Sequence, residues 1–119
     1  MSDFLTRHAS AVAAGDLDAV MALYADGATL LSFDWTADGA EAVRERFQDF
    51  FDFHGEISDV EVRYQTTTDD AAFALYSVTG ERGTFRLMNA FDLDGDRCTR
   101  HFSNEVGADL DRDQVERDA

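Results

Sequence analysis

The hydrophobic pattern of this chain changes its period near residue 57, and this change restricts the fold more than any other feature. Before residue 57, apolar side chains recur every three or four positions, as they do along one face of a helix. After it, they alternate with polar residues, which is typical of strands in a sheet. A helical first half followed by strands that short turns connect predicts an α+β domain.

The first two helices are expected to meet at a Gly-Asp pair. Residues 2–14 form the first helix, and His8 is the polar side chain on its apolar stripe. Gly15 is suited to end this helix, and Asp16 is suited to cap a second helix that reaches Tyr24. The two helices are therefore expected to follow each other almost directly.

A strand, a loop and a third helix are expected next. The strand covers residues 28–33, and the loop of residues 34–39 carries Trp35. The third helix begins between residues 38 and 40 and ends at Gly55. Its apolar stripe is unusually aromatic and consists of Val43, Phe47, Phe50, Phe51 and His54. A stripe of this size predicts that the helix lies on a large concave surface.

Alternation from residue 57 to about residue 106 predicts a curved antiparallel sheet of four to six strands. The face toward the helices is expected to include Phe73 and Phe85. Tyr76, Met88 and Phe102 are expected to make the opposite face apolar. Residues 1–107 then form one domain, and residues 108–119 form an acidic, disordered tail.

The charge excludes some partners. The 119 residues include 25 acidic and 10 basic ones, for a net charge of −15, and all the basic residues are arginine. So acidic a surface repels nucleic acid and anionic membranes. Acidic charge spread over a chain without lysine favours a salt-adapted organism. A single cysteine, Cys98, and no signal peptide or membrane-spanning stretch indicate a cytoplasmic protein.

Two short motifs carry a family resemblance. The segment LYADGATL at residues 23–30 and the segment HFSNEV at residues 101–106 resemble the NTF2-like superfamily, in particular its SnoaL-like domains. The resemblance covers residues 4–106. It implies helices packed into the concave face of a strongly bent sheet, in a cone that holds a small molecule. It also implies a homodimer formed through the outer face of the sheet.

The catalytic residues of ketosteroid isomerase, a well-understood branch of this superfamily, are not matched. The resemblance places Ser32 where the carboxylate base is expected, His8 in place of a tyrosine and Leu87 in place of an aspartate. Tyr24 does match a tyrosine that supports the oxyanion network of that family. That isomerisation is therefore not expected of this chain.

The candidate site combines possible proton-transfer residues with an apolar wall. His101, His8 and Tyr24 form a candidate acid and base cluster, because imidazole titrates near neutral pH. Each residue also has a structural alternative: His101 and His8 as hydrogen-bonding core residues, Tyr24 as part of a helix stripe. The expected ligand-binding residues line the cone and are Ser32, Trp35, Phe47, Phe51, Phe73, Phe85, Leu87, Asn89, Thr99 and Ser103. No cofactor is expected, and the spacing of acidic residues, histidines and cysteine predicts no metal site.

Two functions remain open at this point. One is a pocket protein that binds a small, mostly apolar molecule and whose chemistry, if any, is proton transfer. The other is a non-catalytic homodimeric association module whose cone is filled by its own phenylalanines. An open cavity favours the first function, and a filled one favours the second.

Overall fold

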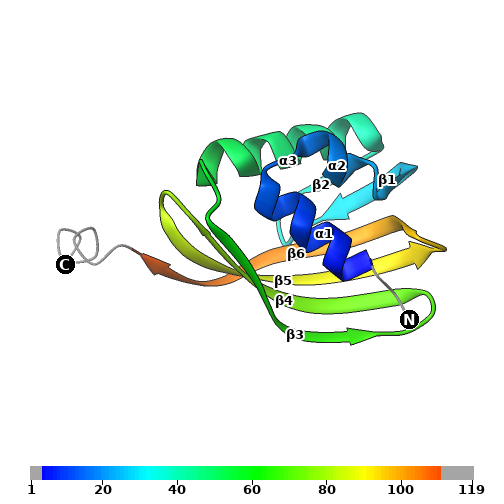
Figure 1. Cartoon of the computed structure of the whole chain (residues 1–119). Coiled ribbons are helices and arrows are strands. Elements are labelled where there is room, and N and C mark those ends of the chain that lie inside the picture. Colours follow the sequence, from blue (N-terminus) through cyan, green and yellow to red (C-terminus); the bar gives the residue numbers. More distant parts are fainter. Residues whose placement is uncertain (1–3, 111–119) are drawn as a thin grey trace.

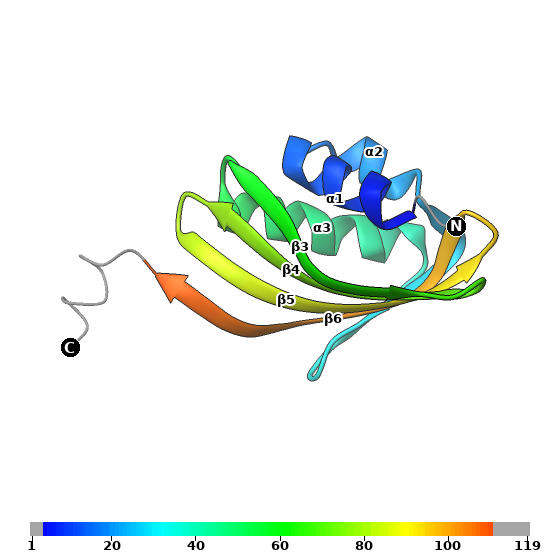
Figure 2. The ribbon, with the colours of Figure 1, turned by 60° about the horizontal axis from the view of Figure 1, so that its bottom comes forward.

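Helices lie on the concave face of a strongly bent sheet in the computed structural model, which describes residues 4–110 (Figure 1). Figure 2 shows the layers from the side, with the helices on the inner side of the curve. The expectation of an α+β cone is confirmed. Over residues 4–110 the elements are α1 (Phe4–Ala14), α2 (Leu17–Met21), β1 (Tyr24–Leu31), β2 (Thr36–Asp38), α3 (Ala40–His54), β3 (Asp59–Thr67), β4 (Ala71–Gly80), β5 (Gly83–Asp94) and β6 (Arg97–Leu110).

The junction between α1 and α2 forms as the Gly-Asp pair predicts. Gly15 has a φ of 63°, and its amide donates to the Val12 carbonyl at 3.0 Å. The Asp16 amide reaches the Ala11 carbonyl at 3.2 Å, which completes a Schellman motif. The Asp16 carboxylate then accepts from the Ala19 amide at 3.1 Å and caps α2.

The prediction that the second helix reaches Tyr24 is wrong. Helix α2 ends at Met21, and Tyr24 is the first residue of β1. The Leu23 carbonyl accepts from the Cys98 amide of β6 at 2.8 Å. The backbone at this point therefore pairs with the sheet and does not continue the helix. Tertiary contacts outweigh local periodicity in so short a helix.

The six strands formed by residues 4–110 lie in the order β2-β1-β6-β5-β4-β3. The expectation of a purely antiparallel sheet needs one correction, because β1 runs parallel to β6. The chain enters β1 from the helices and leaves β6 at the end of the domain, so no hairpin joins these two strands. The predicted loop also contains the short strand β2, which pairs with β1.

The predicted orientation of β4 is reversed in the structure. Tyr76 is buried under the helices, whereas Phe73 points outward and is 45% exposed. Both faces of β4 are apolar, so alternation alone does not say which one turns inward. Ala72 and Ala74 are both buried, and their small side chains leave room for α1, which contacts β4.

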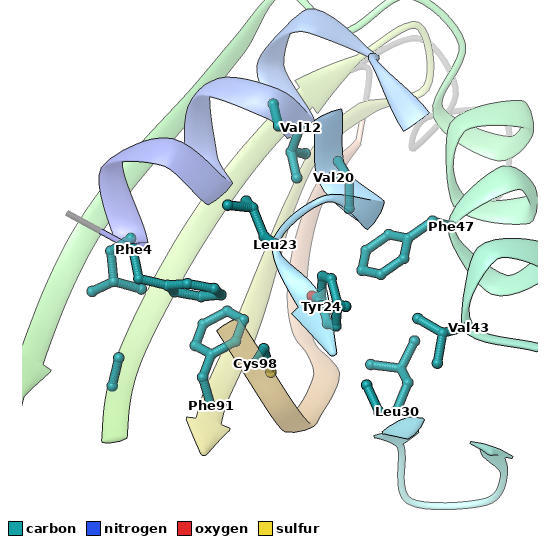
Figure 3. Packing of buried hydrophobic residues seen from close by; sticks show 14 of the residues in the cluster. Phe4, Val12, Val20, Leu23, Tyr24, Leu30, Val43, Phe47, Phe91 and Cys98 are labelled. Atoms are coloured by element: carbon teal, nitrogen blue, oxygen red, sulfur yellow. The ribbon is translucent and has the colours of Figure 1, made fainter. Parts of the chain in front are cut away.

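The core lies between the helices and the concave face of the sheet. Figure 3 shows Phe4 of α1 close to Phe91 of β5, and Phe47 and Val43 of α3 beside Tyr24. The rings of Phe4 and Phe91 meet edge to face, with centroids 4.9 Å apart. Each fully buried Phe stabilises the fold by about 2–3 kcal/mol, so these contacts hold the helices against the sheet.

The end of the domain lies further along the chain than expected. Strand β6 continues past residue 106 to Leu110, so the first residues of the expected tail belong to the sheet. The rest of that expected tail, residues 111–119, lies outside the described residues. Within residues 4–110, the structure has no helix that is long and apolar enough to cross a membrane.

Candidate functional site

A cavity of about 280 Å³ lies between the helices and the concave face of the sheet. Its walls come from α1, α3, β1, the loop between β1 and β2, and the three strands β4, β5 and β6. Most of the surface of the wall is apolar. The lining residues are His8, Val12, Leu30, Ser32, Trp35, Arg46, Phe47, Phe50, Tyr76, Val78, Leu87, Asn89, His101, Ser103, Asn104 and Glu105.

One continuous chain of side-chain hydrogen bonds includes four of these lining residues and Tyr24, which lies behind them. The Tyr76 hydroxyl lies 3.0 Å from His8 Nδ1, and His8 Nε2 lies 2.9 Å from the Tyr24 hydroxyl. The Tyr24 hydroxyl lies 2.7 Å from His101 Nδ1, and His101 Nε2 lies 2.8 Å from Asn89 Oδ1. Five residues from α1, β1, β4, β5 and β6 therefore share one network.

The aromatic core positions the two histidines of this network. The His101 ring stacks on Phe91 with centroids 4.1 Å apart, and the His8 ring meets the edge of the same Phe91 at 4.9 Å. The Phe47 ring of α3 meets the His8 ring edge to face and lies nearly parallel to the His101 ring, with centroids 6.3 Å from each. The packing leaves each imidazole little freedom to turn, so the hydrogen-bond geometry is fixed in advance of any ligand.

Burial keeps both histidines neutral. Loss of hydration lowers the pKa of His8 to about 3. Burial, and then the proximity of His8, lowers the pKa of His101 well below its ordinary value. Burial also raises the pKa of the Tyr24 hydroxyl and that of Tyr76. At neutral pH the network therefore consists of uncharged groups.

The hydrogen bonds decide what the histidines are able to do. All four ring nitrogens of His8 and His101 already have a side-chain partner. A ligand that exchanges a proton with either ring must first displace Tyr24, Tyr76 or Asn89. A low pKa also makes an imidazole a weak base, since general bases work best when their pKa lies near the working pH. The arrangement is thus better suited to holding a ligand than to accepting its proton.

Two charged residues, Arg46 and Glu105, are among those that line the cavity. The Arg46 guanidinium lies over the Trp35 ring, 4.0 Å from the centroid. Ser32 donates to Asn104 Oδ1 at 2.6 Å, and the Phe33 amide donates to the same oxygen at 2.8 Å. These contacts tie the loop between β1 and β2 to α3 and β6. Trp35 is therefore held beside the cavity.

The structure brings most of the candidate residues together. Tyr24 joins His8 and His101 from behind the wall, and its hydroxyl links the two rings. The candidates that line the cavity are His8, His101, Ser32, Trp35, Phe47, Leu87, Asn89 and Ser103.

Four expected ligand-binding residues do not line the cavity. Phe73 is on the outer face, and Phe85 packs against His54, with ring centroids 5.0 Å apart. Phe51 is partly buried against the core beside Phe50. Thr99 donates to the Asp92 carbonyl at 3.2 Å. Phe51 and Phe85 are as apolar as the cavity wall, so the period of the sequence alone does not show that they lie outside it.

Sequence reasoning missed Tyr76 as a member of the site. It belongs to the strand face that was expected to point outward, and its hydroxyl ends the network at the cavity. The pair of alanines at residues 72 and 74 is the signal that marks its face as the one under a helix. Arg46 and Glu105 were missed as well, because charged residues follow no apolar pattern.

Comparison with protein families identifies a match. The model of the SnoaL-like domain family matches residues 5–101 of this chain. This range includes β1 to β5, α2, α3, all of α1 except Phe4, and the network residues from His8 to His101. No curated protein sequence matches the chain.

Solved structures with the same fold include three informative neighbours. A provisionally assigned polyketide cyclase from Sinorhizobium meliloti has 19% identity and a TM-score of 0.73, over 87% of this chain and 95% of that one. A SnoaL-like protein from Burkholderia thailandensis has 20% identity and a TM-score of 0.74, over 88% and 92%. A protein with a ketosteroid isomerase-like fold from Catenulispora acidiphila, solved with trimethylamine, has 14% identity and a TM-score of 0.71, over 87% and 86%. At these identities the likeness shows the fold alone.

Proposed function

This chain belongs to the SnoaL-like domain family, and we propose that it binds a small, mostly apolar molecule in the cavity under its helices. The observation that carries this proposal is the cavity itself. Its volume of about 280 Å³ is close to the lower end of small-molecule sites, roughly 300–1,000 Å³. Its wall is apolar, and it offers a few fixed polar groups, which is the usual composition of such sites.

The alternative is an association module with a filled cone. The phenylalanines of the core do not fill the cone in this structure. Phe47 and Phe50 line the cavity, while Phe73 and Phe85 lie elsewhere. Four residues of the hydrogen-bond network also line this open cavity, where a bound molecule would contact them. We therefore place ligand binding first.

A cavity-filling variant tests the proposal. Leu87→Trp adds bulk inside the cavity, and Met88→Trp adds the same bulk one residue later, on the other face of β5. Mass spectrometry under native conditions identifies small molecules that copurify with the wild type. We expect Leu87→Trp to lose them and Met88→Trp to retain them. Equal retention by both variants, or no bound molecule in any protein after screening of apolar compounds, would refute ligand binding in the cavity.

Proton transfer is a second candidate function, and the network supports it in one respect. His8, Tyr24 and His101 are hydrogen-bonded in series, and both rings reach the cavity wall. The test is deuterium exchange at the carbon beside the carbonyl of a small ketone in D₂O. His101→Ala should abolish any exchange that the wild type catalyses without unfolding the protein. Wild-type exchange at the rate of buffer alone would exclude this chemistry for that class of ketone.

We also propose that two copies of the chain associate through the outer face of the sheet. Phe73, Ala90 and Phe102 are neighbours across β4, β5 and β6, and Leu31 continues the row on β1. Phe73 is 45% exposed and Phe102 is 40% exposed. A row of exposed apolar side chains on one face is typical of an association surface. Sedimentation of the purified protein tests this.

A further inference from the structure

We infer that the cavity selects a neutral ligand that carries a hydrogen-bond donor, such as an alcohol, a phenol or an N–H group, and that the Tyr76 hydroxyl oxygen accepts from it. This inference rests on the proposed function and names the class of ligand. It follows from the direction of the hydrogen bonds in the network, which one residue determines.

Asn89 sets that direction. Its Nδ2 donates to the Leu87 carbonyl at 3.2 Å, so its Oδ1 faces His101 Nε2 at 2.8 Å and the Ser103 hydroxyl at 2.9 Å. An amide oxygen accepts and does not donate. His101 therefore carries its proton on Nε2. The opposite orientation of Asn89 would set its oxygen against the Leu87 carbonyl, oxygen to oxygen.

The rest of the network follows from the state of His101. A neutral imidazole with its proton on Nε2 has a bare Nδ1, so His101 Nδ1 accepts the Tyr24 proton. The Tyr24 oxygen then accepts from His8 Nε2, which leaves His8 Nδ1 bare as well. His8 Nδ1 accepts the Tyr76 proton at 3.0 Å. If both rings were cationic, both would donate to Tyr24, and the Tyr24 proton would lose its acceptor.

Tyr76 is the end of this directed chain, and it lines the cavity. Its single proton is committed to His8, and among residues 4–110 its hydroxyl has no second hydrogen-bond partner. What remains is acceptor capacity on the oxygen. A ligand hydroxyl is able to donate to it, whereas a ketone or carboxylate oxygen would meet it lone pair to lone pair. The network is therefore not arranged to stabilise an enolate at Tyr76.

A matched pair of ligands tests the preference. 2-Indanol carries a hydroxyl where 2-indanone carries a carbonyl on the same apolar skeleton. One additional hydrogen bond predicts that the wild type binds 2-indanol about five- to tenfold more tightly in calorimetric titration. Tyr76→Phe keeps the ring and should remove the preference. Equal or tighter binding of 2-indanone by the wild type, or an unchanged preference in Tyr76→Phe, would overturn the inference and leave the proposed pocket intact. If neither compound binds the wild type, the inference fails, and the screen of apolar compounds decides separately on the proposed pocket.

A measurement on the unaltered protein gives an independent answer. ¹⁵N chemical shifts of the imidazoles distinguish protonated from bare ring nitrogens, and the chain has three histidines. His54→Gln, a substitution outside the network, removes one set of signals and helps to assign the others. We expect both His8 and His101 to be protonated on Nε2 and bare on Nδ1. A proton on Nδ1 of either ring at neutral pH would overturn the inference.

Discussion

The two faces of the sheet are formed by the same strands but differ in the polarity and the burial of their side chains. On the concave face, Tyr76, Asn89 and His101 are polar and buried, and each is hydrogen-bonded to another side chain. On the outer face, Phe73 and Phe102 are apolar and exposed. This is the reverse of the usual arrangement in a sheet, because here polar side chains are buried and apolar rings are exposed.

This difference indicates which face of the sheet serves ligand selection and which serves assembly. A buried polar group is costly without a partner, so the inner network must be complete in order to persist. An exposed apolar ring costs little in the folded monomer but favours association. We therefore expect changes inside to affect stability and ligand selection, and changes outside to affect assembly.

Removal of one inner hydroxyl should have the largest effect. Tyr24→Phe takes away the partner of both His8 Nε2 and His101 Nδ1, and we expect a loss of about 4 kcal/mol in the free energy of unfolding, since each orphaned buried group costs about 1–3 kcal/mol. The control is Tyr64→Phe on β3, where the side chain is 67% exposed and the loss should stay within about 0.5 kcal/mol. Urea denaturation measures both. Similar losses in the two variants would remove the distinction between the faces.

Protonation of the inner face in acid should cause the second largest loss in the free energy of unfolding. The folded pKa of His8 is about 3, below the unfolded value of 6.5, so the unfolded chain binds the proton first. Its contribution is complete above pH 6.5 and is lost as the pH falls toward 3. At pH 4.5 we expect the wild type to have lost about 3 kcal/mol more than His8→Gln has lost relative to pH 7. Parallel pH profiles for the two proteins would show that His8 is not held neutral.

Salt should change the stability of the protein only through its charged surface. With a net charge of −15 and no lysine, the surface repels itself, and this repulsion is screened in molar KCl. We propose that the chain is adapted to salt and expect a gain of about 2 kcal/mol, roughly 10 °C in Tm, between low and molar KCl. The deficit of Tyr24→Phe should be the same at both salt concentrations, because the inner groups are neutral. A flat response of the wild type would refute the adaptation to salt.

A charge on the outer face should have the smallest effect on folding and a clear effect on assembly. Phe102→Glu places a carboxylate in the exposed apolar row, where we expect dimers to dissociate while the free energy of unfolding changes by less than about 1 kcal/mol. Analytical ultracentrifugation measures the assembly. A wild type that sediments as a monomer would contradict the proposed dimer, and a Phe102→Glu variant that still dimerises would place the interface elsewhere.

Much of the fold was predictable because local signals agree with the tertiary structure. Gly15 and Asp16 form the predicted helix end and cap, and the alternation of β5 places Leu87 and Asn89 on the inner face as expected. The periodicity predicted the wrong element where one residue fits the pattern of both a helix and a strand. Tyr24 fits the stripe of a helix and also fits the start of a strand, and the hydrogen bond between Leu23 and Cys98 decides for the strand.

The candidate site was predictable only in part. His8 stands out as the polar residue on the apolar stripe of a helix, and His101 was expected to face inward from the last strand together with Thr99 and Ser103, so both were found. Tyr76 was missed because β4 is apolar on both faces, and only the packing of α1 over its alanines shows which face turns inward. The direction of the hydrogen bonds depends on the side-chain orientation of Asn89, which no sequence pattern encodes.

The most direct test follows the methyl groups of the two faces by NMR as 2-indanol is added. Val12, Leu30, Val78 and Leu87 line the cavity, whereas Leu75 and Met88 lie on the outer face. We predict saturable shifts of the four inner residues and unchanged signals from the two outer ones. Shifts confined to the outer residues, or no shift of any inner methyl group at saturating ligand, would contradict a binding cavity between the helices and the sheet.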